Sequence, residues 1–458
     1  MPAAPGDIAP YLEDSSGYRG EADALFAPST VEELREILNS ASHDLIPITI
    51  AGAGTGLTGA RVPHGGWILS LDHFRTLRVE RGRAICGPGV ALADLHRAAA
   101  ATRQFFGPNP TEISASIGGI IATNAGGARS FRYGPVRRHI LALTVTLVDG
   151  TTRRVARGER VDFPFQPVHA PDTTKNSAGY HLHPDLDWVD LFCGSEGTLG
   201  IITEAEFQLL PEPGAILAGI IFFPSEDDAL AAVTAWRALP ELRFLEFMDN
   251  ASLDLLRPRY SEIPSEASAA LFIEQNLSSE DDPEIDAWTE RMRAQNAIAG
   301  ASWFALDARG REQFRAFRHA LPSAVLDLVR RNGFPKAVTD FAVPLAHDLD
   351  LHTRYKRGCE EFFPGQHTIF GHAGDANNHV NLFPTTAAQA MRAEALMQEF
   401  AEYVVTLKGT VAAEHGIGKT KTGLLALMYS PEEIASMRAV KQHLDPACLL
   451  GRGTIFAA

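Results

Sequence analysis

The chain has few cysteines, fewer basic than acidic residues and no long hydrophobic run. Its four cysteines, Cys86, Cys193, Cys359 and Cys448, lie far apart and form no CxxC pair, which excludes a disulfide framework, a zinc finger and an iron–sulfur site. No stretch approaches the roughly 18 uninterrupted apolar residues that cross a bilayer. The 41 Lys and Arg residues stand against 56 Asp and Glu, a formal charge of -15, so we expect no nucleic acid among the partners.

Residues 1–23 are proline-rich and acidic, and they lack the basic start and apolar run of a secretory signal. We therefore expect a cytoplasmic protein. Peripheral contact at the inner face of the membrane stays open as an alternative, and so does a homodimer.

The 458 residues, 45% of them hydrophobic, suffice for two or three folded units of ~100 to 200 residues each. Short strands and few helices alternate over the first 205 residues. After Pro211 and Pro213 helices alternate with strands, a pattern that suits helices packed on an antiparallel sheet. We therefore predict an α+β protein with units at residues 1–210, 211–415 and 416–458.

Capping signals, hydrophobic periodicity and turn residues predict the individual elements. Helices are predicted over residues 91–106, 283–297, 311–332 and 386–408, and after the N-caps Thr30, Ser225 and Ser430. Strands are predicted over residues 45–51, 66–71, 215–223, 269–274 and 337–343, with hairpins at 139–156 and 367–383.

A glycine-rich loop, Gly54-Thr-Gly-Leu-Thr-Gly59, satisfies the pattern GxGxxG directly after a predicted strand. In a dinucleotide-binding Rossmann fold such a loop opens a helix, but here Pro63, Gly65 and Gly66 follow and the next predicted element is a strand. We therefore reject a nicotinamide site. The backbone N–H groups of the loop can still converge on a phosphate, although a plain glycine-rich turn would have the same sequence.

Three further stretches of small residues, Pro108–Thr111, Ile117–Gly127 and Gly194–Gly200, suit a long, flat, phosphate-bearing cofactor that lies against main chain. In these loops the chain resembles the flavoproteins of the vanillyl-alcohol oxidase and p-cresol methylhydroxylase type, and among them the D-lactate, glycolate and D-2-hydroxyglutarate dehydrogenases, over roughly residues 25–455. The resemblance implies a two-part FAD-binding domain, a substrate (cap) domain with an antiparallel sheet, and a C-terminal helical segment that returns to the FAD domain.

The resemblance also implies which residues contact the flavin. The glycine loop contains no histidine or cysteine for a covalent link, so we expect non-covalent FAD. Contacts are implied for Gly52, Ala53, Gly54, Thr55, Gly56, Leu57, Pro108, Thr111, Gly118, Gly119, Ala122, Thr123, Asn124, Gly126, Arg132, Tyr133, Gly134, Glu196, Gly197, Gly200 and Ile202.

A second motif, His372-Ala-Gly-Asp-Ala-Asn-Asn-His379, lies between two apolar runs and predicts a hairpin. Its closure brings two imidazoles together at a spacing that suits one metal ion, although such a pair can also be a plain polar contact. Glu414 and His415 add a carboxylate and a third imidazole. Two histidines and one carboxylate leave coordination positions open, as a catalytic metal site requires.

In the family that the chain resembles, the residues matching His372, His379 and Glu414 hold a divalent ion. We expect Zn²⁺ first, with Mn²⁺ or Fe²⁺ as alternatives. The resemblance further implies that His415 is the base that takes a proton from the substrate. Ala376 stands where the family usually has glycine, which leaves the expected ligands intact.

A 2-hydroxy acid carries a carboxylate, so a cation is expected near the metal. Arg318 matches the substrate-carboxylate arginine of the family, Lys336 lies near a position where some relatives carry lysine, and Asn381 matches a substrate-contacting asparagine. Solvated cations, and a purely structural role for Asn381, are the alternatives. We favour D-lactate, because a five-carbon diacid needs a second cation and the sequence offers only Arg318 and, less securely, Lys336.

These features predict an FAD- and metal-dependent D-2-hydroxyacid dehydrogenase that passes electrons to a quinone, a cytochrome or an electron-transfer flavoprotein. The alternatives within the same branch are a D-2-hydroxyglutarate and a glycolate dehydrogenase. Two alternatives from other classes stay open: a non-oxidative flavoprotein similar to the ether-lipid synthases, and a subunit that binds FAD only to relay electrons.

Overall fold

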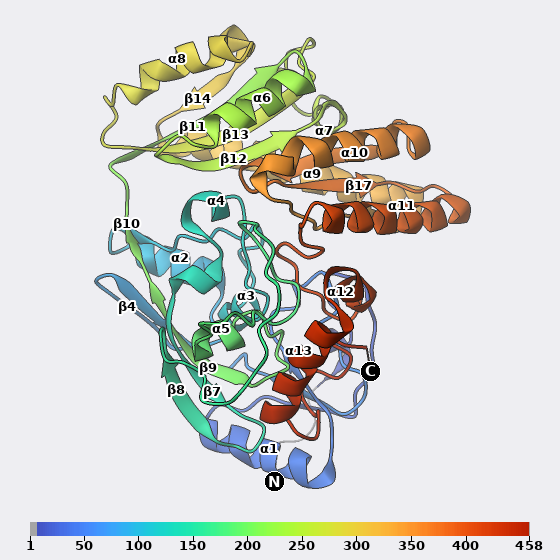
Figure 1. Ribbon diagram of the computed structural model, residues 1–458. Coiled ribbons are helices and arrows are strands. Elements are labelled where there is room, and N and C mark those ends of the chain that lie inside the picture. The colour runs from blue at the N-terminus through green and yellow to red at the C-terminus, as the bar shows by residue number, and fades with distance from the viewer. Residues whose placement is uncertain (1–6, 458) are drawn as a thin grey trace.

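The computed structural model describes residues 7–457 and places two parts of the chain one above the other (Figure 1). The first half of the chain forms the lower part in this view, and most of the second half forms the upper part. Mixed helices and antiparallel sheets in two parts confirm the predicted α+β fold class. The boundaries near residues 210 and 415 stay predictions.

The lower part contains three small sheets. A three-stranded parallel sheet has the order β1-β3-β2, formed by Ala24–Phe26, Trp67–Ser70 and Ile48–Ala51. A five-stranded antiparallel sheet has the order β4-β5-β9-β7-β8, formed by Leu77–Glu80, Arg83–Cys86, Ile201–Gln208, Ile140–Thr146 and Thr152–Ala156. The short strands β6 (Gln104–Phe105) and β10 (Leu210–Pro211) pair with each other. The helices of this part are α1 (Val31–Asp44), α2 (Leu92–Ala100), α3 (Ile117–Ala122), α4 (Ser130–Tyr133) and α5 (Trp188–Phe192).

The glycine-rich loop connects two neighbouring parallel strands, β2 and β3. No helix follows it before β3 begins at Trp67, so the loop is not the start of a Rossmann helix and the rejection of a nicotinamide site is consistent with the fold.

The upper part is built on a seven-stranded antiparallel sheet of the order β14-β11-β13-β12-β16-β17-β15. Its strands are Trp303–Ala305, Ala215–Phe223, Ala269–Leu277, Leu242–Met248, His367–His372, Asn377–Leu382 and Ala337–Val338. Its helices are α6 (Glu226–Trp236), α7 (Asn250–Leu256), α8 (Glu284–Ala294), α9 (Ala308–Asn332), α10 (Asp348–Phe362) and α11 (Ala387–Thr406). The sheet is buried among these helices, since all seven residues of β12 are buried.

The C-terminal segment returns to the lower part, where α12 (Thr422–Met428) and α13 (Pro431–Leu444) lie in Figure 1. The capping box predicted at Ser430 and Glu433 opens α13. The Ile48 backbone N–H donates a hydrogen bond to the carbonyl of Leu449, and the Gly451 N–H donates one to the carbonyl of Ile48. The chain end is thereby joined to the strand that precedes the glycine loop.

Three predicted elements differ from the structure. The helix predicted over residues 91–106 ends at Ala100, because Arg103 has a positive φ of 55° and the chain turns into β6. The strand predicted over residues 337–343 continues as a strand only at Ala337–Val338, beyond which the Thr339 hydroxyl accepts the N–H of Val380 and the Asp340 carboxylate accepts the N–H of His415. The stretch from Ile117, for which we expect a loop, forms α3, because the Ser116 hydroxyl accepts the Gly119 N–H as its N-cap.

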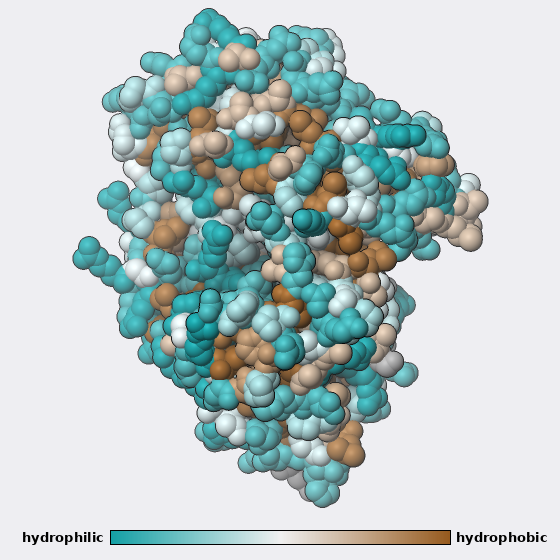
Figure 2. Space-filling view, in the orientation of Figure 1, coloured by the Kyte–Doolittle hydropathy of each residue, from teal (hydrophilic) through white to brown (hydrophobic). Residues whose placement is uncertain are grey.

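Among residues 7–457, no helix is both long and apolar enough to cross a membrane. Polar residues cover most of the face shown in Figure 2, with hydrophobic residues in small groups between them.

Candidate active site

The hairpin of β16 and β17 brings two histidines together. His379 on β17 pairs with Phe370 on β16. His372 lies two residues after Phe370, and its side chain is therefore on the same face of the sheet as Phe370 and His379. Their ring centroids are 5.5 Å apart. The tight turn between them is possible because Ala376 adopts a left-handed backbone with φ 50°.

The loop that carries Glu414 and His415 is fixed to the lower part of the molecule. The carboxylate of Glu196 accepts the backbone N–H groups of Ile417 and Gly418, both at 2.8 Å. The Thr58 carbonyl, in the glycine-rich loop, accepts the N–H of Lys419 at 2.8 Å. Gly418 has a φ of 53°, and a Cβ there would lie 2.1 Å from the Thr58 carbonyl oxygen, so only glycine fits.

The two parts of the chain meet at the carboxylate of Glu414. Its Oε1 lies 3.1 Å from Nε2 of His372, and 3.6 Å from Nε2 of both His379 and His415. One ligand atom each from His372, His379 and Glu414 falls within 4.8 Å of the others. The structure thus brings together the three ligands expected from the sequence.

The second oxygen of Glu414 is held from the other side. Lys175 Nζ donates to Oε2 at 3.1 Å, and the Gly127 N–H donates to it at 3.0 Å. Burial would raise the pKa of Glu414, but Lys175 and His372 outweigh it and hold this pKa well below its ordinary value. The group is therefore an anionic carboxylate whose Oε1 is directed at three imidazoles.

The outer nitrogen of each hairpin histidine faces an oxygen atom, so each ring can present Nε2 to a cation. Nδ1 of His379 is hydrogen-bonded to the carbonyl oxygen of Thr339 at 2.8 Å, and Nδ1 of His372 lies 2.7 Å from Oε1 of Glu246, an ion-pair distance without the alignment of a hydrogen bond. An N–H on Nδ1 that donates to such an oxygen leaves Nε2 as the lone-pair donor. This donor set, two imidazole nitrogens and one carboxylate oxygen, fits a divalent metal with open positions.

His415 is oriented by Asp340. Its backbone N–H donates to Oδ2 of Asp340 at 3.0 Å, and its Nδ1 lies 3.4 Å from the same oxygen. Burial lowers the pKa of His415 to about 4, against the opposing charge of Asp340. The imidazole is therefore neutral near pH 7 and can accept a proton.

Arg318 on α9 is tied to the same group of residues. Its Nε and Nη2 donate to the two oxygens of Glu246 at 2.7 and 2.8 Å, and Nη1 donates to the Thr111 hydroxyl at 3.0 Å. Of the five guanidinium N–H groups, these three contacts leave two for a ligand.

Lys336 and Asn381 form a second polar pair beside the hairpin. Lys336 Nζ donates to Oδ1 of Asn381 at 2.6 Å, while the buried Nδ2 of Asn381 has no hydrogen-bond partner among the described residues. Burial lowers the pKa of Lys336 to about 8. A free, buried amide N–H suits a substrate oxygen, whereas Oδ1 of the same side chain accepts from Lys336.

A cavity of about 290 Å³ runs along the glycine-rich loop and is also lined by Glu414 and His415. Its walls include most residues expected to contact FAD: Gly52, Ala53, Gly54, Thr55, Gly56, Leu57, Thr111, Gly118, Gly119, Ala122, Thr123, Gly126, Glu196, Gly197, Gly200 and Ile202. Within the described chain, the N–H groups of Gly54 to Gly59 donate no hydrogen bond. A main-chain wall with free N–H groups fits the pyrophosphate of a dinucleotide cofactor.

Five residues expected to contact FAD are not in the walls of this cavity. Pro108 and Gly134 are absent from its lining, and Asn124 accepts the backbone N–H of Arg137. Arg132 pairs with Glu241 at 2.9 Å, and the Tyr133 hydroxyl accepts from Asn276 at 2.9 Å. These last two side chains join the lower part to the upper sheet instead.

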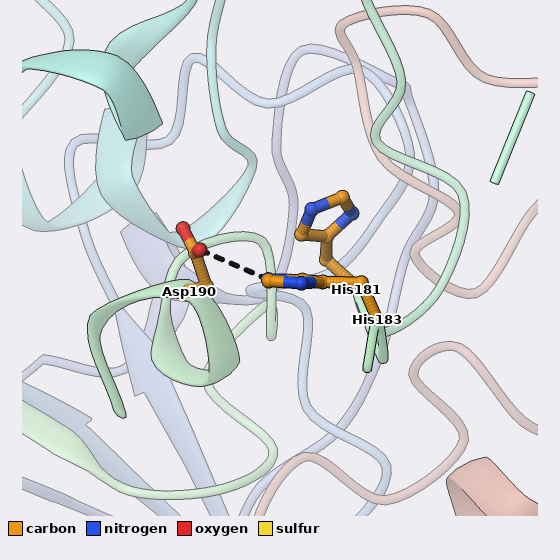
Figure 3. Close-up of side chains that lie close together, drawn as sticks. All are labelled: His181, His183 and Asp190. Atoms are coloured by element: carbon orange, nitrogen blue, oxygen red, sulfur yellow. Dashed lines mark hydrogen bonds and ion pairs between the residues drawn. The ribbon is translucent and has the colours of Figure 1, made fainter. Parts of the chain in front are cut away.

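A second group of metal-ligand types, His181, His183 and Asp190, lies elsewhere in the lower part (Figure 3). Asp190 is already paired with Arg157 at 2.6 Å and Arg137 at 3.3 Å. Burial and then Arg137 lower the pKa of His181 to about 3. Two guanidinium charges neutralise the carboxylate that a divalent cation would need, so we assign no metal here.

Sequence reasoning missed three residues that hold the site together: Glu246, Lys175 and Asp340. Each is a charged group that is almost completely buried, a rare state unless the group is paired. A carboxylate within the apolar run Leu242–Met248 was a usable signal, since strands buried on both faces seldom contain one.

Comparison with known proteins agrees with this architecture. A family profile described as FAD binding domain matches residues 22–156, and one described as FAD linked oxidases, C-terminal domain, matches residues 212–455. The chain is 31% identical to glycolate oxidase subunit GlcD of Bacillus subtilis, over 96% of this chain and 90% of that protein. It is 31% identical to a D-lactate dehydrogenase of Archaeoglobus fulgidus over 93% of this chain and 90% of that one.

A third relative, the D-2-hydroxyglutarate dehydrogenase of Xanthomonas citri, is 28% identical over 99% of this chain and 93% of that protein. Among solved structures, an alkyldihydroxyacetonephosphate synthase has the same fold, with a TM-score of 0.67 at 16% identity, over 94% of this chain and 77% of that one. The matched profiles and relatives together show that the chain belongs to the FAD-linked oxidoreductases of the vanillyl-alcohol oxidase and p-cresol methylhydroxylase type.

Proposed function

We propose that this protein is an FAD- and divalent-metal-dependent dehydrogenase that oxidises D-2-hydroxy acids to 2-oxo acids. The observation that carries the proposal is the position of Glu414 and His415. Both line the cavity of the glycine-rich loop, and Oε1 of Glu414 also faces the two hairpin histidines. Relatives that are named for the substrates glycolate, D-lactate and D-2-hydroxyglutarate support the same reaction class.

Part of the chemistry would come from FAD and a divalent ion, and part comes from the side chains of the protein. Bound FAD supplies a two-electron acceptor for the hydride at C2, and a divalent ion on His372, His379 and Glu414 would supply a Lewis acid that lowers the pKa of the substrate hydroxyl. His415 takes the hydroxyl proton on its neutral imidazole, and Asp340 orients the ring. The substrate thus loses one hydride from C2 and one proton from its hydroxyl group and becomes a 2-oxo acid.

Arg318 and Asn381 position the substrate in this proposal. Arg318 has two guanidinium N–H groups left for the carboxylate at C1 after its contacts with Glu246 and Thr111. Asn381 offers its unpaired Nδ2. A quinone, a cytochrome or an electron-transfer flavoprotein takes the electrons onward, by analogy with the family.

Anaerobic flavin bleaching tests the function most simply. Purified holoenzyme is mixed with D-lactate, the substrate favoured from the sequence, and with glycolate and D-2-hydroxyglutarate, with L-lactate as the stereochemical control. We expect a D-2-hydroxy acid to bleach the yellow flavin and L-lactate to leave it oxidised. A flavin that no 2-hydroxy acid reduces would contradict the proposal and favour the non-oxidative or electron-relay alternatives.

A further inference from the structure

A second cavity, of about 540 Å³, lies between the two parts of the chain. One wall comes from α2 and β6 of the lower part, and the other from β12, β13 and α9 of the upper part. Pro110 and Thr111 line both this cavity and the one along the glycine-rich loop. The two cavities are therefore neighbours, separated by the segment whose Thr111 hydroxyl bonds to Arg318.

The inner wall of this cavity holds more positive than negative charge. Arg129 and Arg243 share a single carboxylate, Glu274, at 2.8 and 3.6 Å. Arg243 is only 2% exposed, and its Nε, like that of Arg129, has no hydrogen-bond partner among the described residues. A buried guanidinium is unfavourable unless an anion compensates its charge. One carboxylate neutralises one of the two charges, while Arg243 also donates to Oδ1 of Asn276 at 3.0 Å and lies over the rings of Phe105 and Tyr133.

The helix α9 adds further cations to the same cavity. Arg315 and Arg318 are one turn apart and both line it. The side chain of Arg315 is 53% exposed and pairs with Glu312 at the rim. His96 lines the opposite wall, where its buried Nε2 has no hydrogen-bond partner within residues 7–457. The cavity therefore has a cationic wall beside Arg318, with donors that no group of the described chain satisfies.

We propose that the cavity lined by Arg129, Arg243 and Arg315 binds a carboxylate or other oxyanion at the far end of an extended 2-hydroxy acid. The inference rests on the proposed function, and it changes the substrate expected from the sequence. From the sequence alone we favour D-lactate, because Arg318 and Lys336 are the cations that it offers to the substrate. The fold places three more arginines beside Arg318: Arg315, one turn earlier on α9, and Arg129 and Arg243, which lie in distant segments of the chain.

The kinetic test uses a substrate series and a matched pair of variants. Arg315→Gln removes an exposed cavity cation, and Arg330→Gln is the control, because Arg330 also lies on α9 and pairs with an acid three residues earlier, Asp327, outside the cavity. We expect kcat/KM for a diacid among D-malate, D-2-hydroxyglutarate and D-2-hydroxyadipate to exceed that for D-lactate. Arg315→Gln should lower the diacid value about tenfold, as loss of one charge-assisted contact predicts, and leave D-lactate unchanged.

A binding test separates this inference from the proposed function. Glutarate, which has no hydroxyl to oxidise, and inorganic phosphate are titrated into the holoenzyme by calorimetry. We expect glutarate to bind about tenfold more weakly to Arg315→Gln than to Arg330→Gln. If no 2-hydroxy acid bleaches the flavin while glutarate binding still depends on Arg315, the proposed function fails and the anion site stands.

Two results would overturn the inference. One is glutarate binding that is the same in both variants. The other is tight phosphate binding together with equal kcat/KM for D-lactate and every diacid, which would assign the cavity to a free anion and not to the substrate.

Discussion

The carboxylate of Glu246 lies 2.7 Å from Nδ1 of His372, on the side of the ring opposite Glu414. The same carboxylate accepts two hydrogen bonds from Arg318. Arg318 and then His372 hold the pKa of Glu246 well below its ordinary value, against the effect of burial. One buried anion on β12 thus orients both an expected metal ligand and the expected substrate arginine.

Glu246→Gln should weaken the proposed metal site without removing a ligand. Loss of an outer-shell carboxylate typically lowers metal affinity 10- to 100-fold. The measurement is metal content by mass spectrometry after dialysis against a buffered chelator. Glu274→Gln is the control, since Glu274 is also buried on a neighbouring strand and pairs with an arginine, but contacts no expected metal ligand. Equal metal retention in the two variants would contradict the role given to Glu246.

His415→Ala should retain FAD and lose flavin reduction. The side chain is replaced but the loop is held by backbone contacts to Glu196 and Thr58, so the cofactor cavity should persist. Removal of a general base typically lowers the rate by 10²- to 10⁴-fold. Anaerobic stopped flow with the best D-2-hydroxy acid gives the rate, and flavin absorbance gives the FAD content. A wild-type reduction rate would remove His415 from the mechanism.

His96 should titrate far below an ordinary histidine. Burial, and then the charges of Arg129 and Arg315, lower its pKa to about 4. Between about pH 4 and the unfolded value of ~6.5 the unfolded chain binds more protons, so His96 contributes stability that is complete above pH 6.5 and is lost as pH falls through 4. Arg315→Gln should raise this pKa.

The histidine ring signals in a proton–carbon NMR titration measure the pKa of His96 directly, with His96→Gln to assign the resonance. The result that would contradict the account is titration near pH 6.5 in the wild type, with no change in Arg315→Gln.

Ala376→Gly should be nearly neutral for stability. The left-handed backbone of Ala376, with φ 50°, is unfavourable by about 1–2 kcal/mol for a residue with a Cβ, and relief of this strain offsets the lost buried methyl and the greater freedom of glycine in the unfolded chain. Ala373→Gly, in the same turn but without a positive φ, should lower the free energy of unfolding by about 1–2 kcal/mol. Urea denaturation of the two variants compares them. An equal loss in both would show that Ala376 is not strained.

Local features of the fold could be read from the sequence. The hairpin with His372 and His379 depends on apolar runs and turn residues within a few positions of each other, and the glycine-rich loop could be placed between two strands by its flanking residues. The helix after residue 91 was predicted too long, because apolar periodicity does not show where a residue such as Arg103 takes a positive φ.

The contacts between site residues that are far apart in the sequence could not be predicted from local sequence patterns. Glu246 reaches His372 only because β12 pairs with β16, strands more than a hundred residues apart. Arg129, Arg243 and Arg315 meet because the turn before α4, the strand β12 and the helix α9 border one cavity. Such pairings depend on the whole fold, and no periodicity or spacing in the chain encodes them.

In the proposed mechanism a divalent ion on His372, His379 and Glu414 is required for flavin reduction. The most direct test is anaerobic reduction of the bound flavin by a D-2-hydroxy acid, measured on the same holoenzyme before chelation, after chelation to verified metal-free protein, and after addition of Zn²⁺ or Mn²⁺. We expect reduction to stop on metal removal and to return with the ion, while FAD stays bound throughout. Unchanged reduction in the metal-free protein would contradict this mechanism.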